Sequence, residues 1–374
     1  MASAQTKVNA AALPKSLNKT FEVTLAPPSL ASGGIANSPN LSRGVIHLRH
    51  WINLQVTVNI ANANTTATTV GGTASPNGAL DYLQQIYYSA NDIDKFYVLS
   101  GQHAFKIGMW QMGINAQTVL SSSSPFRQDS IITAPTASIP ASENSNFTAN
   151  YWIPITFSGT HTTTPSVLGF STLNPSITVF EINASFGTVA SMLSGIASGL
   201  TASITAASLS VYSEFYPPNL GIGNVAGSYE PPYYTGLAQA NTAEPTGATT
   251  KGSIGGIPYG SSYVYKSLFL FVDNNSSSPF YTPSDDILTS IDLKFNTKNY
   301  IYNQVDAGML KAEAQLTGNN SAAVGMYPIQ LIYQGGLNDV LNTTNFSSFN
   351  LNFAISQGAN LTLIGETIND NVKA

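Results

Sequence analysis

Cysteine is absent from the 374 residues, which excludes disulfides, thiolate metal ligands and a thiol nucleophile. Charge is also scarce, since Asp, Glu, Lys and Arg make up 9% of the chain, against about 25% in an average soluble protein. The formal net charge of −5 argues against a protein that is held on nucleic acid through phosphate contacts, because such proteins are basic.

Two kinds of apolar segment are also missing. The sequence contains no run of about 18 apolar residues, the length that a transmembrane helix requires. Its first residues, MASAQTKVNAAALPKSLNK, lack the apolar core of a secretory signal. The sequence therefore predicts neither a membrane-spanning helix nor a cleaved export signal.

Aromatic and neutral polar residues take the place of the missing charge. Phe, Trp and Tyr make up 10% of the chain and apolar residues 43%, so a large hydrophobic core can form. Disorder does not explain the low charge, because disordered chains are poor in aromatic residues and usually rich in charge. A length of 374 residues exceeds that of one ordinary β-sandwich and suits two domains.

Alternation of apolar and polar residues predicts long β-strands. In the segment 45–60, VIHLRHWINLQVTVNI, the even-numbered positions are apolar except for His50, which is the period of a strand with one buried face. The segment 146–158, NFTANYWIPITFS, alternates in the same way and places Trp152 on the outer face. The run LFLFV at 268–272 is apolar throughout and predicts a strand that is covered on both faces.

Helices are predicted to be few. The segment 303–316 has apolar residues at helical spacing, Pro76 is a candidate start for a short helix that runs to about Gln85, and Val189–Leu200 has a weaker pattern. Many strands and few helices predict β-sandwich or jelly-roll architecture. Further strands are expected near 20–25, 95–105, 176–187, 203–216, 263–272, 287–296, 326–333, 348–356 and 360–367.

Glycine and proline divide the chain into two halves. They recur between Pro217 and Ser262 without a lasting periodicity, and we interpret this stretch as an ordered strap. The predicted organisation is an N-terminal arm at 1–21, a first β-domain at 22–217, the strap at 218–262 and a second β-domain at 263–374.

Histidine spacing raises the question of a metal site. His47 and His50 form an H-x-x-H pair, and the remaining histidines are His103 and His161. On a regular strand, residues 47 and 50 point to opposite faces, which does not suit a shared zinc ion. We therefore expect one exposed histidine and one hydrogen-bonded histidine in the core.

Two further groups are candidate ligand sites. Asp285 and Asp286 could join the segment 273–278 in offering oxygen ligands to Ca²⁺, although Asp-Asn runs after a strand more commonly form turns. The aromatic segment YEPPYYTG, 229–236, is suited either to stacking on sugars or to packing the junction between the domains. The sequence has no nucleophile-elbow, Walker or dinucleotide-binding motif. We therefore expect a protein that is not an enzyme, without catalytic residues, cofactor or metal.

Five segments of the sequence carry a family resemblance. They are LDYLQQIYYSANDI (80–93), TANYWIPITFS (148–158), SVLGFSTLNPSITVFEINASF (166–186), LSVYSEFYPPNL (209–220) and YKSLFLFVDNNS (265–276). In this order they resemble segments of the double jelly-roll major capsid proteins of the lineage that includes tectiviruses and adenovirus hexons. In that family the fourth segment closes the first jelly roll, and the fifth opens the second beyond a crossover.

The resemblance implies an all-β fold of two tandem eight-stranded jelly rolls, with a few short helices in the connecting loops. It implies a virion protein, made in the host cytoplasm, whose pseudo-hexagonal homotrimers tile the icosahedral capsid shell of a dsDNA virus, usually over an internal membrane. The implied partners are neighbouring trimers, minor capsid and vertex proteins and the viral membrane, without direct contact to nucleic acid. Lys7, Lys15 and Lys19 in the arm are the candidate membrane-facing residues, because basic side chains bind anionic leaflets.

Two other classes remain open on sequence alone. A surface-layer protein or adhesin would share the cysteine-free, Thr- and Asn-rich composition, but it should carry an export signal. A glycan-binding β-sandwich would use exposed aromatic residues, and a glycoside hydrolase would need a pair of carboxylates in a cleft. The low charge also predicts little self-repulsion as the pH falls, and therefore particles that stay intact well below neutral pH.

Overall fold

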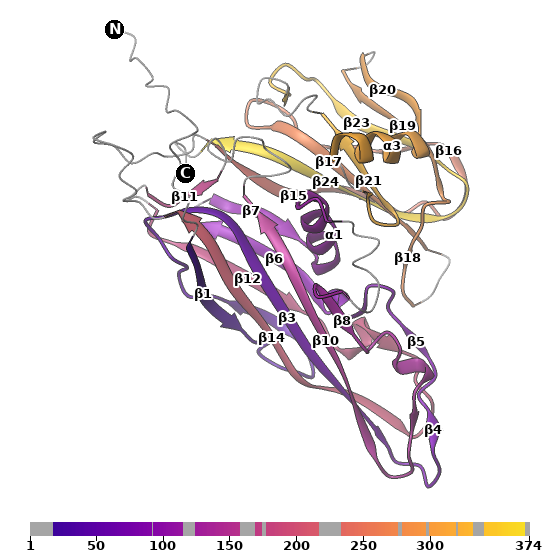
Figure 1. Ribbon diagram of the computed structural model, residues 1–374. Helices are drawn as coiled ribbons and strands as arrows, with labels where there is room; N and C mark the ends of the chain where they lie inside the picture. The colour runs from indigo at the N-terminus through magenta and orange to yellow at the C-terminus, as the bar shows by residue number, and fades with distance from the viewer. Residues whose placement is uncertain are drawn as a thin grey trace.

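Two β-sandwiches lie side by side in Figure 1, with helix α1 (Gly101–Gln111) between them. The first, roll 1, comes from the indigo-to-magenta half of the chain, and the second, roll 2, from the orange-to-yellow half. Lys7, Lys15 and His161 lie outside the described residues. The computed structural model describes residues 18–91, 93–114, 124–157, 169–173, 177–216, 233–275, 279–296, 299–318, 321–331 and 340–370.

Roll 1 consists of two facing sheets in which the first and last strands are neighbours, as in a jelly roll. Sheet 1A has the order β1 (Asn18–Leu25), β14 (Leu200–Tyr216), β3 (Ile46–Asn62), β10 (Asn144–Thr156) and β8 (Arg127–Asp129). Sheet 1B has the order β7 (Ile93–Leu99), β6 (Leu83–Ala90), β12 (Phe180–Phe186) and β2 (Gly34–Asn37).

Roll 2 repeats this strand order. Sheet 2A contains β15 (Tyr233–Ala243), β24 (Ala359–Asp370), β17 (Val264–Asn274) and β21 (Met326–Gln330). Sheet 2B contains β16 (Thr249–Ile254), β23 (Phe349–Ile355), β19 (Leu288–Phe295) and β20 (Asn299–Asp306). The predicted all-β fold of two tandem eight-stranded jelly rolls is confirmed.

The two rolls share one continuous sheet. Strand β15 of sheet 2A pairs in parallel with β7 of sheet 1B, with Leu237 opposite Tyr97 and Ala238 opposite Val98. Shorter elements lie in the connections: β4 (Thr68–Thr69), β5 (Thr73–Ala74), β9 (Ser138–Ile139), β11 (Phe170–Ser171), β13 (Leu193–Ser194), β18 (Thr282–Pro283), β22 (Leu341–Asn342), and the 3₁₀ turns η2 (Gly78–Asp81), η3 (Ala134–Thr136) and η4 (Val189–Ser191).

The range expected to be a strap contains the first two strands of roll 2. Strands β15 and β16 both lie within 218–262, and β15 pairs along its length with β24. Their sequences, YYTGLAQANTA and TTKGSI, are rich in Gly, Ala and Thr, so they lack the apolar alternation that would have marked them as strands. Strand β1 likewise begins at Asn18, inside the range expected to be an arm.

The helices differ from the prediction in three places. The strand expected at 95–105 ends at Leu99, and α1 follows, with the hydroxyl of Ser100 accepting from the His103 amide. The helix expected at 303–316 is α3 (Ala307–Gly318), preceded by strand β20. The helices expected from Pro76 and within Val189–Leu200 are single 3₁₀ turns, η2 and η4.

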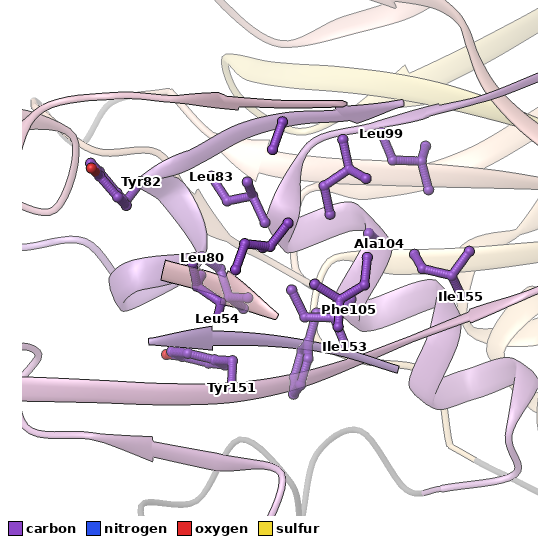
Figure 2. Close-up of a cluster of buried hydrophobic side chains, with 14 of the residues drawn as sticks. Leu54, Leu80, Tyr82, Leu83, Leu99, Ala104, Phe105, Tyr151, Ile153 and Ile155 are labelled. Carbon is purple, nitrogen blue, oxygen red and sulfur yellow. The ribbon is translucent and has the colours of Figure 1, made fainter. Parts of the chain in front are cut away.

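Helix α1 belongs to the hydrophobic core of roll 1. Figure 2 shows Ala104 and Phe105 among side chains from β3, β6 and β10, including Leu54, Leu83 and Ile153. The long strand predicted at 45–60 is confirmed as β3, and LFLFV lies within β17 with every side chain buried.

Candidate functional site

His47 and His50 lie together in the core of roll 1, so the expected opposite orientation is wrong. Both side chains are fully buried, and His50 Nε2 lies 3.0 Å from His47 Nδ1. Strand β3 has a bulge at Leu48. Its neighbours His47 and Arg49 pair with Phe215 and Glu214, which are consecutive in β14, so Leu48 has no partner in that strand. One unpaired residue shifts the alternation of a strand and turns both rings to the same side.

Hydrogen bonds fix the tautomers of both rings. His47 Nε2 lies 2.9 Å from the carbonyl oxygen of Ser42 and must donate to it, which leaves His47 Nδ1 to accept from His50 Nε2. His50 Nδ1 then accepts from the Tyr88 hydroxyl at 2.9 Å. Burial lowers the pKa of His47 to about 4 and the pKa of His50 well below 6.5, so both rings are neutral near pH 7.

His103 lies on α1 at the junction between the rolls. Its ring centroid is 4.3 Å from that of Phe271 on β17, and its Nδ1 is 3.0 Å from the Ser100 hydroxyl. Burial and the nearby ammonium of Lys106 lower the pKa of His103 to about 3. Within the described ranges, no three His, Asp or Glu side chains are grouped so that they could hold a metal ion.

A buried carboxylate links α1 to roll 2. Glu366 of β24 is fully buried, and its Oε1 accepts from Gln111 Nε2 at 2.9 Å and lies 3.6 Å from Lys266 Nζ. Its Oε2 accepts from the Ser267 hydroxyl. Gln111 Oε1 accepts from the Thr156 hydroxyl of β10 at 2.9 Å, so one side chain of α1 bonds to both rolls.

The candidate calcium ligands have other partners. Asp285 pairs with Lys311 Nζ. Burial raises the pKa of Asp273, and the charge of Lys106 opposes this rise. The side-chain amide of Asn275 donates to the Pro245 carbonyl oxygen at 3.1 Å, and residues 276–278 of the expected site lie outside the described residues.

The aromatic segment 229–236 contributes to the core where it is described. Tyr234 is 4% exposed, and its ring packs edge-on against Phe96 and Phe170, with centroids 5.3 and 5.0 Å away. Because Tyr234 belongs to β15 and both phenyl rings belong to roll 1, this side chain packs the junction between the rolls and is not open to a sugar.

The outer face of sheet 1A carries an exposed aromatic groove of about 410 Å³. Trp51 of β3 stacks on Phe126 with centroids 6.1 Å apart, and Trp152 of β10 lies 5.6 Å from Tyr212 of β14. Trp152 was expected on this outer face. Grooves of this kind mark contact surfaces. The residues that line the aromatic groove are Lys19, Trp51, Pro125, Phe126, Trp152, Tyr212, Ser213 and Glu214.

Glu214 pairs with two cations beside the aromatic groove, Lys19 and Arg49. Its Oε1 accepts from Lys19 Nζ at 2.8 Å and from Trp51 Nε1 at 3.0 Å, and its Oε2 pairs with Arg49 at 3.1 Å. The side chain of Glu214 is 4% exposed, whereas that of Lys19 is 69% exposed. Lys19, expected in the arm, therefore lies in β1 with a carboxylate partner.

None of the described helices is long and apolar enough to span a membrane. No protein-family model and no curated protein matches the sequence. Its likeness to known proteins is therefore a likeness of structure.

Solved structures of three viral proteins are similar over nearly the whole chain. The major capsid protein of Sulfolobus Turreted Icosahedral Virus superposes with a TM-score of 0.60 at 16% identity, covering 95% of this chain and 97% of that one. The major capsid protein of Bacteriophage PM2 gives 0.54 at 10% identity, covering 94% and 98%. The PBCV-1 virus capsid gives 0.56 at 10% identity, covering 94% and 93%. The chain thus has the double jelly-roll fold.

Proposed function

We propose that the chain is the major capsid protein of an icosahedral dsDNA virus and acts as a structural component of the virion. The observation that carries this proposal is the double jelly-roll fold, which extends over 95% of the chain and 97% of a viral major capsid protein. The proposed role is non-enzymatic, because a shell protein acts by burying surface against its neighbours.

Self-association explains both the low charge and the exposed aromatic groove. Permanent interfaces bury roughly 2,000–5,000 Å² and resemble a protein core cut in half, and an unpaired charge buried there costs several kcal/mol. A chain with 9% charged residues has few charges to bury, and at the groove Lys19 and Arg49 share the carboxylate of Glu214, which lowers that cost. We propose that three copies form a pseudo-hexagonal capsomer that packs against neighbouring trimers.

The proposed membrane contact involves the N-terminal arm. Lys7 and Lys15 would supply the basic side chains for an anionic leaflet beneath the shell, since Lys19 pairs with Glu214. Minor capsid and vertex proteins complete the proposed set of partners. The glycan-binding alternative loses its candidate segment where that segment is described, because Tyr234 is buried. We assign the exposed aromatic groove to self-association instead, because the fold is that of viral capsid proteins.

The experiment that tests this function is a mass measurement of the purified protein by light scattering. We expect a species with three times the 39.5 kDa mass of the monomer, and larger assemblies at high concentration. A protein that stays monomeric from micromolar to millimolar concentration would contradict the proposal.

A further inference from the structure

The two α-helices of the described residues occupy equivalent places in the two rolls. Helix α1 follows strand β7 of sheet 1B and precedes β10 of sheet 1A, and α3 follows β20 of sheet 2B and precedes β21 of sheet 2A. Because the strand orders of the two rolls match, α3 has the same position in roll 2 as α1 has in roll 1.

Within the chain, α1 packs on the outer face of sheet 2A. Strand β17 turns Leu268 and Leu270 into the core of roll 2 and Phe269 and Phe271 toward roll 1. Trp110 packs edge-on against Phe269 at 5.5 Å, alongside the contact of His103 with Phe271. Figure 1 shows α1 in this position between the two sandwiches.

The corresponding face of α3 carries two large, exposed apolar side chains. Counted from the first residue of each helix, Met309, Ala312 and Leu316 match His103, Lys106 and Trp110, the residues of α1 that face β17. Met309 is 60% exposed and Leu316 is 82% exposed. Their spacing forms one apolar stripe along the helix.

The corresponding face of sheet 1A is also open, and it carries the aromatic groove. Trp51 and Trp152 lie on β3 and β10, which match β17 and β21 of sheet 2A in strand order. Each chain therefore contains one complete contact of a helix on a sheet, that of α1 on sheet 2A, which is buried. It also exposes both surfaces of an equivalent contact, namely the apolar stripe of α3 and the outer face of sheet 1A. Because the contact within the chain joins the same two kinds of surface, a second copy of this chain offers each exposed surface its matching partner.

We propose that α3 of one copy packs on the outer face of sheet 1A of the next copy, with Met309 and Leu316 entering the aromatic groove beside Trp51 and Trp152. This inference rests on the proposed function and assigns its trimer interface to particular residues. The contact joins two different surfaces, so it is head-to-tail, and in the proposed trimer three such contacts complete a ring around the three-fold axis.

The first test places charge on the exposed stripe of α3. Because both side chains are exposed, the double variant Met309→Lys/Leu316→Lys should fold normally while its self-association weakens by about a hundredfold or more, the loss typical of a central interface contact. Trp152→Lys, in the aromatic groove, should have the same effect. Ile35→Lys, at a residue 55% exposed on β2 of sheet 1B, is the matched control and should remain trimeric.

Light scattering and circular dichroism of these variants separate the possible outcomes. A trimeric wild type with monomeric, folded variants at α3 and at the groove supports the inference. A trimeric wild type whose α3 variant also stays trimeric overturns the inference and leaves the proposed function standing. A monomeric wild type contradicts the proposed function itself. Dissociation of the α3 variant without dissociation of the groove variant assigns α3 a different partner and overturns the inference.

The absence of cysteine permits a second test that does not depend on weakened binding. Leu316→Cys combined with Lys19→Cys, at the rim of the aromatic groove, should give covalent trimers with a short bis-maleimide cross-linker. Leu316→Cys combined with Ile35→Cys should not. Equal cross-linking of the two pairs, or none of either in a trimeric protein, would overturn the inference.

Discussion

Gln111 donates a hydrogen bond of 2.9 Å to Glu366 across the junction between the two jelly rolls. The acceptor is a carboxylate with no exposed surface, and the donor belongs to α1, which packs in the core of roll 1 and against Phe269 and Phe271 of roll 2. A buried carboxylate is stabilised only when its oxygen atoms are hydrogen-bonded. The bond therefore adds a specific polar contact to the strand pairing of β15 with β7 and the aromatic contacts that join the two rolls.

Removing this bond should destabilise the whole chain. Gln111→Ala takes one donor from Glu366 and the acceptor from Thr156, and loss of buried partners costs about 1–3 kcal/mol. Urea unfolding measures the difference. Gln128→Ala, at an exposed residue of β8, is the control and should change stability by less than about 0.5 kcal/mol. Equal effects of the two variants would show that the bond contributes nothing specific.

The buried histidines should make the protein less stable in acid. The pKa of His47 is lowered to about 4 and that of His103 to about 3, from 6.5 in the unfolded chain. The unfolded state therefore binds protons first as the pH falls below 6.5, and stability declines until the folded-state pKa is reached. Between pH 7 and 4.5 the loss is about 2–3 kcal/mol for each of these residues.

This effect opposes the acid tolerance expected from the low charge. Two buried carboxylates act in the other direction: the pKa values of Asp81 and Asp273 are raised by burial, so their contribution to stability grows as the pH falls. His103→Gln isolates the histidine contribution, because its unfolding free energy should change less between pH 7 and 4.5 than that of the wild type. An identical change in both proteins would contradict the assignment.

Close packing of α1 against β10 should make Gly108 intolerant of a side chain. A Cβ atom added at Gly108 would lie 2.0 Å from the carbonyl oxygen of Pro154, so either the helix or the strand must move. Gly108→Ala should cost about 1–3 kcal/mol despite the better helix propensity of alanine. Gly247→Ala, where an added Cβ meets no atom within 4 Å, should leave the melting temperature nearly unchanged. A similar melting temperature for both variants would refute the close contact.

The ion pairs around the aromatic groove should hold Trp51 in place. Glu214→Ala leaves Arg49 and the Trp51 indole without their acceptor, which should cost about 1–3 kcal/mol and shift the tryptophan fluorescence to longer wavelength. Glu143→Ala, at an exposed residue, serves as the control. Unchanged fluorescence in Glu214→Ala would show that the indole does not depend on this carboxylate.

The sequence predicts those strands and helices that have one buried face and one exposed face. Strand β3 could be predicted because one face is apolar and the other polar along its length. Helix α1 could not, because nearly all of GQHAFKIGMWQ is buried between two rolls, which removes the polar face that would reveal a helical period. Strand β15 is missed for a related reason, since hydrogen bonds to β24 and not apolar side chains define it.

The site features are less visible in the sequence than the strands are. The contact of His47 with His50 depends on the bulge at Leu48, and the place of a bulge is not encoded in the apolar pattern. The aromatic groove combines residues from strands far apart in the chain, such as Trp51 and Tyr212. The outward orientation of Trp152 follows from alternation, because it requires the local period alone.

A cryo-electron microscopy reconstruction of the purified protein tests the central claim most directly. We predict a closed trimer with six jelly rolls in a near-hexagonal ring, and density for α3 of each copy against the aromatic groove of the next. A reconstruction of single chains, or of an assembly in which the outer face of sheet 1A remains in contact with solvent, would contradict this account.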